Sequence, residues 1–266
     1  MAQLSFRILG CGSSGGVPRL GGHWGACDPD NPKNERKRCS LLIERRCNDY
    51  ITRVLIDTSP DLRSQLLDAG VGSLDGVVYT HSHADHVHGL DDLRMIVFNM
   101  RKRLKVWADT PTQENLMDRF GYAFVQPAGS PYPPILELND LKDITVVTGD
   151  GGKIELEPFK VEHGSMHALG FRIGPLVYLP DVSALNQDAW NAIKGAECWV
   201  LDALRRDPHP SHTHLAQSLK WINEAGVASG VLTNMHIDLD YDTLCSELPK
   251  GVVPAYDGMT LSYTVP

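Results

Sequence analysis

The 266-residue chain contains no apolar run that approaches the ~20 residues needed to cross a membrane. Its first ten residues lack the basic segment and long apolar stretch of a secretory signal, so no signal peptide is predicted. The six cysteines are scattered along a large chain, which is typical of reduced thiols in a cytosol and not of a disulfide framework. Together these absences predict a cytoplasmic protein.

Basic residues are also in short supply, with 25 Lys and Arg against 33 Asp and Glu and a net charge of −8. That balance argues against a broad nucleic-acid surface, so no stable nucleic-acid complex is expected. A small anionic substrate is still compatible with this charge, because bound metal ions reverse its local sign. The sequence also lacks a linker-like stretch, and residues 1–266 are predicted to form a single domain, with a homodimer as the default assembly.

The order of the predicted elements favours an α/β fold. Several strands come first, followed by strands that alternate with helices, and this order occurs twice. It suits two sheets packed face to face with helices outside, a four-layer αββα sandwich. The elements that matter most for the site are strands at Ile51–Ile56, Val77–Tyr79, Ile154–Val161, Leu176–Leu179 and Val231–Thr233, and helices at Asp85–Asn99 and His214–Ala225.

The densest motif is Thr80-His81-Ser82-His83-Ala84-Asp85-His86, which follows a short buried strand. Imidazole nitrogens and carboxylate oxygens are the ligands that borderline and harder divalent metals prefer. In an extended turn His81 and His83 can point the same way, while Asp85 and His86 can face a second ion from the start of a helix. Four ligands at this density predict two metal ions, and incidental histidines in a polar loop are the less favoured interpretation.

Three further candidates lie just beyond the ends of predicted strands, where loops gather to build sites. His163, Asp181 and His236 each occupy such a position, although each alone would be unremarkable. Asp181 could bridge both ions with one oxygen to each.

The pattern His-x-His-x-Asp-His, followed by a distant His, a distant Asp and a final His, resembles the metallo-β-lactamase superfamily. The resemblance covers nearly the whole chain and implies a metallo-β-lactamase αββα sandwich. It implies that His81, His83 and His163 bind one metal, that Asp85, His86 and His236 bind the second, and that Asp181 bridges them. It also implies that Asp57, in Leu-Ile-Asp-Thr, supports the histidine motif from behind.

A narrower resemblance lies in the early loop, which reads Gly10-Cys11-Gly12-Ser13-Ser14-Gly15-Gly16-Val17-Pro18, then Cys27, then Arg38-Cys39-Ser40. With Leu239-Asp240-Tyr241 near the end, it is similar to the phosphodiesterase family of the carbon–phosphorus lyase pathway. The same glycines fit a dinucleotide fingerprint, but Pro18 stands where the helix of that motif should begin.

The chain departs from the family pattern in two places. The last metal ligand usually follows Thr directly, but Asn234 stands there and the histidine comes at position 236, so either residue could complete the second metal shell. The better-known relative holds a structural zinc in part with closely paired cysteines in the early loop, and this chain has no such pair. His23, Cys27 and Cys39 are weak candidates for such a zinc, and reduced cysteines that pack as small hydrophobes are at least as good an interpretation.

The predicted function is a dinuclear metal-dependent hydrolase, a phosphodiesterase that opens small cyclic phosphates or nucleotides with a hydroxide held by two divalent ions, Zn²⁺ or Mn²⁺. Asp85 and Asp181 would hold the catalytic ions. The resemblance implies that His212, in Ser211-His212-Thr213-His214, protonates the leaving group, with His214 as an alternative acid or phosphate contact and helix capping as the structural alternative.

A rival function is hydrolysis of carbon esters, as in a lactonase or thioesterase, on the same two ions. That enzyme would need no histidine acid near position 212. A metal-binding module without catalysis would need a closed site, which the lack of a cysteine-rich shell disfavours. A redox enzyme with two irons would need a flavin-binding domain, which the sequence does not show.

Overall fold

The computed structural model describes residues 1–266, which divide into two compact units. Unit 1 consists of Met1–Leu9, Ser40–Ile154 and Thr260–Pro266, and unit 2 consists of Gly10–Cys39 and Glu155–Met259. That residues 1–266 form a single domain stays a prediction. No helix is long and apolar enough to span a membrane.

Unit 1 is built on a seven-stranded sheet of order β14-β1-β2-β3-β4-β5-β6. Antiparallel pairs join β1 to β14 and β2 to β3, whereas β3, β4, β5 and β6 run parallel. The carboxyl ends of the parallel strands therefore share one edge, where sites are commonly built. The strands are β1 (Ala2–Gly10), β2 (Ser40–Cys47), β3 (Tyr50–Ile56), β4 (Gly76–Val78), β5 (Leu104–Ala108), β6 (Leu136–Asp140) and β14 (Thr260–Val265), with β7 (Thr145–Gly149) following β6.

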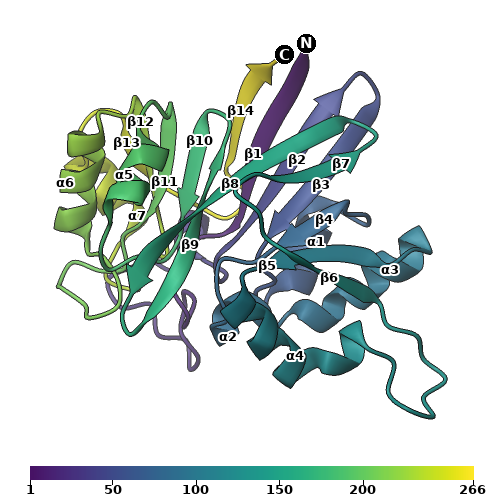
Figure 1. Ribbon diagram of the computed structural model, residues 1–266. Coiled ribbons are helices and arrows are strands. Elements are labelled where there is room, and N and C mark those ends of the chain that lie inside the picture. Colours follow the sequence, from purple (N-terminus) through teal and green to yellow (C-terminus); the bar gives the residue numbers. More distant parts are fainter. The chain divides into compact units, whose positions relative to one another are not determined.

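Helices α1 (Leu62–Ala69), α3 (Leu93–Met100) and α4 (Thr110–Phe124) lie together beside strands β4 to β6 (Figure 1). Their apolar side chains join those of the sheet in one buried cluster. Removing this much apolar surface from water is the main source of stability. The expected helix at Asp85–Asn99 is instead divided into α2 (Ala84–Val87), a 3₁₀ turn (Leu90–Asp92) and α3. The Gly89 amide donates to the Thr58 carbonyl at 2.9 Å, and not to a carbonyl one helical turn back, so the helical hydrogen bonds are interrupted there.

The second sheet has seven strands in the order β13-β12-β11-β10-β9-β8-β7, and its strands from β9 to β13 belong to unit 2. Strands β8 and β9 are antiparallel, as are β9 and β10, and β10 to β13 run parallel. Strands β8, β10, β11 and β12 thus point the same way and end at one edge. The elements are β8 (Gly152–His163), β9 (Met166–Ile173), β10 (Leu176–Leu179), β11 (Cys198–Asp202), β12 (Ser229–Thr233), β13 (Val252–Pro254), α5 (Gln187–Ile193), α6 (Leu215–Ala225) and α7 (Tyr241–Glu247).

The glycine-rich segment that begins unit 2 is an irregular loop with one 3₁₀ turn, Pro32–Asn34, and it leads into no helix after its glycines. Gly12 forms bridges to both Arg38 and Met235, and a Cβ added to Gly12 would lie 2.8 Å from the Arg36 carbonyl oxygen. Only glycine permits that approach. The loop therefore contacts Met235, which follows the end of β12. No helix follows its glycines, so the segment is not a dinucleotide-binding motif.

Candidate metal centre

The histidine motif of unit 1 begins three residues after β4 and continues into the four-residue helix α2. The short apolar strand Gly76–Val78 is fully buried, so it fixes the point at which the motif starts. His81 and His86 are buried, whereas His83 is exposed. The ring centroid of His81 lies 4.6 Å from that of His83 and 4.3 Å from that of His86, which places the three imidazoles together.

Asp57, at the end of β3, organises this motif from behind. Its Oδ2 lies 2.7 Å from His86 Nδ1 and accepts a 2.7 Å bond from the Thr80 hydroxyl. Because that hydroxyl donates to Asp57, it can accept the proton of His81 Nδ1, which lies 2.9 Å away. Burial raises the pKa of Asp57, and the charge and hydrogen bond of His86 oppose that shift. Asp57 thus fixes the orientation of two imidazoles, the supporting role expected of it.

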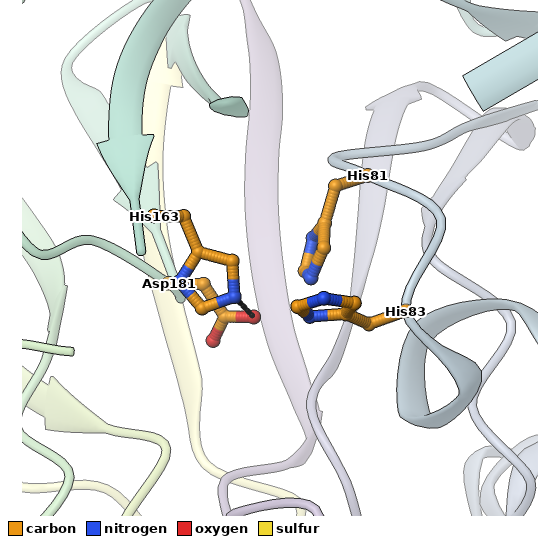
Figure 2. Close-up of side chains that lie close together, drawn as sticks. All are labelled: His81, His83, His163 and Asp181. Atoms are coloured by element: carbon orange, nitrogen blue, oxygen red, sulfur yellow. Dashed lines mark ion pairs between the residues drawn. The ribbon is translucent and has the colours of Figure 1, made fainter. Parts of the chain in front are cut away.

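The other parts of the motif are Asp85 and the turn between His81 and His83. Asp85 is half-buried, and its Oδ2 lies 3.7 Å from His86 Nε2. Arg119 of α4 donates a 2.7 Å hydrogen bond to the Ser82 carbonyl and so fixes the turn between His81 and His83. Figure 2 shows these two side chains on the loop that follows β4.

His163 and Asp181 come together within unit 2. His163 is the last residue of β8, and Asp181 follows β10 after one intervening proline. The Ser211 carbonyl lies 2.6 Å from His163 Nδ1, and the opposite nitrogen, Nε2, lies 4.0 Å from Asp181 Oδ2 (Figure 2). Both side chains are almost fully buried. Their shared position at strand ends agrees with the sequence prediction.

Asn234, and not His236, lies beside Asp181. The Asn234 amide donates a 2.7 Å bond to Asp181 Oδ1 and a 3.2 Å bond to Asp202 Oδ1. On an extended strand, residues 234 and 236 would lie on the same side. However, β12 ends at Thr233 and Asn234 has a φ of 59°, so the alternation breaks there. His236 instead contacts Arg19 and Asp238.

His212 is held by an aspartate that the sequence analysis did not single out. Its Nδ1 lies 2.9 Å from Oδ2 of Asp202, the fully buried last residue of β11. Burial raises the pKa of Asp202, and the charge of His212 opposes the shift. The signal was present, because Val200-Leu201-Asp202 is an apolar strand that ends in an aspartate, like the strand before Asp57.

Other predicted residues have different surroundings. His214 occupies the N-cap of α6, and its side chain makes no capping bond. The weak zinc candidates have separate surroundings: Cys27 Sγ accepts from Arg36, Cys39 Sγ lies near Gly12 and Thr233, and His23 is exposed. Burial raises the pKa of the Cys27 and Cys39 thiols.

The donor set fits divalent metal ions. His81, His86 and His163 each engage Nδ1 with an oxygen, from Thr80, Asp57 and Ser211 respectively. In metal-ligating histidines such a contact fixes the tautomer and the orientation of the ring, and the opposite nitrogen, here Nε2, binds the metal. Within unit 2, Asp181, Asp202 and His212 also offer ligand atoms that lie within 4.8 Å of one another.

The comparisons agree with this chemistry. The model of the family described as "Beta-lactamase superfamily domain" matches residues 52–237, most of the chain. The chain therefore belongs to this superfamily and has its α/β metallo-β-lactamase fold, as predicted.

Within the superfamily it groups with the PhnP-like phosphodiesterases. A diphosphatase of the PhnP family is 30% identical, with a TM-score of 0.85 that covers 99% of this chain and 98% of that one. The short form of human tRNase Z shares the fold at 16% identity, with a TM-score of 0.68 over 98% of this chain and 100% of that one.

A curated relative, the octanoyltransferase of Porphyromonas gingivalis, is 36% identical over 258 residues. The match covers 95% of this chain and 50% of that protein, so the chain spans about half the length of this relative. The chain thus belongs to the metallo-β-lactamase-fold superfamily and carries histidine and aspartate side chains able to bind metal.

Proposed function

We propose that the chain is a phosphodiesterase that acts on small phosphate esters, cyclic phosphates or nucleotides, with two divalent metal ions. The observation that carries the proposal is that His81, His86 and His163 each engage Nδ1 with an oxygen, the contact that orients metal-ligating histidines. The proposed ligands are His81, His83, Asp85, His86, His163 and Asp181.

Bound Zn²⁺ or Mn²⁺ ions would supply a water of lowered pKa and offset charge on the phosphate oxygens. The protein's own contribution is to orient the ligands. Asp57 and Thr80 hold His81 and His86 from behind, and the Asn234 amide holds Asp181 by its Oδ1, which leaves Oδ2 facing His163. In this arrangement Asn234 supports Asp181 instead of replacing the usual last histidine.

His212 would protonate the departing alkoxide. With Nδ1–H donated to Asp202, the protonated ring presents its second N–H at Nε2 for transfer. Asp202 lies fully buried and also accepts from the Val182 amide, so its carboxylate is fixed in place. A phosphodiester with an alkyl leaving group needs such an acid, whereas carbon-ester hydrolysis on the same ions does not. The His212–Asp202 pair therefore favours phosphodiester hydrolysis over the lactonase or thioesterase alternative.

The test is hydrolysis of bis(p-nitrophenyl) phosphate by the purified protein loaded with Mn²⁺ or Zn²⁺. Asp181→Ala, prepared in parallel, controls for contaminating phosphodiesterases. We expect turnover that disappears in the variant. A protein that binds two ions yet hydrolyses no phosphodiester with either metal would overturn the proposal and favour carbon esters.

A further inference from the structure

A cavity of about 510 Å³ opens to solvent within unit 1. Three segments form it: helix α3, the residues that enter β5 and the residues that enter β6. Its apolar walls are Val97, Phe98, Tyr132, Pro133, Pro134 and Ile135. Small-molecule sites in proteins occupy roughly 300–1,000 Å³ and are lined mainly by apolar and aromatic side chains. The cavity thus has the size and the lining of a ligand site.

The cavity lies at the opposite edge of the sheet from the histidine motif. Arg103 directly precedes β5 and Ile135 directly precedes β6, so both stand at the amino ends of their strands. Strands β4, β5 and β6 are parallel, and His81 follows the carboxyl end of β4. A ligand in the cavity would therefore be distinct from a substrate held at the metal centre, and the inference does not depend on the proposed phosphodiesterase function.

The polar part of the cavity lining is entirely basic, apart from the Tyr132 hydroxyl. No acidic residue lines the cavity, and its basic residues are Arg94, Arg101, Lys102 and Arg103. Arg94 pairs with Asp91 at 2.7 Å. The Arg103 guanidinium donates to the Leu136 carbonyl. Arg101 and Lys102 are exposed and have no carboxylate partner, although the chain carries a net charge of −8. Two adjacent unpaired cations beside an apolar cavity indicate an anionic ligand.

The walls of the cavity are fixed by backbone hydrogen bonds. The Leu104 amide donates to the Ile135 carbonyl at 3.1 Å, and the Ile135 amide donates to the Ala123 carbonyl at 2.9 Å. These bonds tie the segment before β6 to both β5 and α4. Phe98 and Tyr132 nevertheless expose 59% and 74% of their surface. Exposed aromatic rings beside a formed cavity are surfaces that a bound apolar group would remove from water.

We propose that this cavity binds an amphipathic anion: an acyl or alkyl chain of about eight to twelve carbons with a carboxylate or phosphate head group. At roughly 30 Å³ for each water-sized group, the cavity has room for such a chain and its head group. The chain would lie against Phe98 and Tyr132, and the head group would pair with Arg101 and Lys102. A nucleotide fits less well, because the prolines and aliphatic side chains would leave the polar edge of its base unpaired.

Titration calorimetry with the full chain tests this, using octanoate, decanoate, decyl phosphate and decanol below their micellar concentrations. We expect one site, at which decanoate binds about tenfold more tightly than octanoate, because two more methylenes are buried. Decanoate should also bind about fivefold more tightly than decanol, which has the same chain and no charge. The tighter of decanoate and decyl phosphate identifies the head group that the two cations accept.

Variants locate the binding. Phe98→Ala should weaken decanoate binding by about fivefold or more. Met95→Ala is the matched control, because Met95 lies on the same helix, is also 59% exposed and does not line the cavity. It should bind decanoate as the wild type does. The double variant Arg101→Gln/Lys102→Gln should bind decanoate no better than decanol. Asp181→Ala should bind decanoate normally, because the head group does not contact the metal centre.

Four results would overturn the inference. They are no binding of either anion, equal affinities of the wild type for decanoate and decanol, equal weakening in Phe98→Ala and Met95→Ala, and loss of binding in Asp181→Ala. An affinity for anions that does not change with chain length would also contradict it. That result would instead favour a surface for acidic segments of another protein.

Discussion

The two units present their candidate ligands in different ways. In unit 1 the ligands lie within six consecutive residues, and the support from Asp57 comes from the neighbouring parallel strand. In unit 2 they come from the ends of separate strands, and Asn234, Asp202 and His212 form a network that links them to Asp181. The first arrangement is encoded locally, whereas the second exists only after the sheet of unit 2 has formed.

The largest effect should come from breaking the unit 2 network. His212→Asn and Asp202→Asn should lower kcat for an alkyl phosphodiester by about 10²- to 10⁴-fold, the usual contribution of general acid catalysis. Because p-nitrophenolate is a good leaving group that needs no proton, both variants should retain most activity on bis(p-nitrophenyl) phosphate. Equal losses on both substrates would show that the pair has a structural role only.

The corresponding change in unit 1 should act on metal binding instead. Asp57→Asn removes the acceptor behind His86 and Thr80, and we expect metal affinity to fall by about 10- to 100-fold. Titration with a competing chelator measures this. Activity should return at saturating metal, in contrast to Asp202→Asn, whose loss should not depend on metal concentration.

A smaller effect on metal binding should distinguish the role of Asn234 from that of His236. His236→Asn should leave the metal content unchanged, because both of its ring nitrogens are already engaged by Arg19 and Asp238. Asn234→Ala should weaken metal binding by a few-fold, roughly the value of one lost hydrogen bond to Asp181. Loss of one ion from His236→Asn would instead make His236 the last ligand, as the sequence resemblance implies.

The smallest effect on metal binding and activity is expected for Asp257, which lies outside both sets of ligands. Asp257 accepts bonds from the amides of Cys11 and Lys37, and burial raises its pKa to about 7 from an ordinary value of 3.8. The folded state thus holds the proton more tightly, so this group's stabilisation is complete below about pH 4 and is lost as the pH rises through 7. Asp257→Asn should remove a decline in the free energy of unfolding of about 4 kcal/mol, measured by urea denaturation at several pH values. An unchanged decline in the variant would assign it to other groups.

Sequence reasoning succeeded where a local pattern carried the information. The histidine motif, Asp57, His163 and Asp181 could be proposed from the sequence because each follows an apolar strand in a recognisable order, and their roles as ligands stay predictions. Asp202 had the same signal but no family pattern to draw attention to it. The contact between Arg19 and His236 could not be predicted, because these residues lie 217 positions apart along the chain. The left-handed conformation of Asn234 was equally hidden, and it decided which residue faces Asp181.

The fold class was predictable for a similar reason. Two runs of strands with interspersed helices leave few ways to bury the apolar faces, and the α/β arrangement followed from that order. The break of the Asp85–Asn99 helix at Gly89 was not predictable, because it depends on the hydrogen bond from the Gly89 amide to the carbonyl of Thr58, which lies 31 residues earlier in the chain. The local periodicity of apolar residues carries no sign of that bond.

The most direct test of the proposed metal centre is the metal content of the protein. We would measure bound Zn²⁺ and Mn²⁺ by mass spectrometry after dialysis, in the wild type, in His83→Ala and in His163→Ala. We expect two ions per wild-type chain and a loss of bound metal in both variants. Two ions retained in either variant would show that the substituted histidine is not a metal ligand and would contradict the proposal.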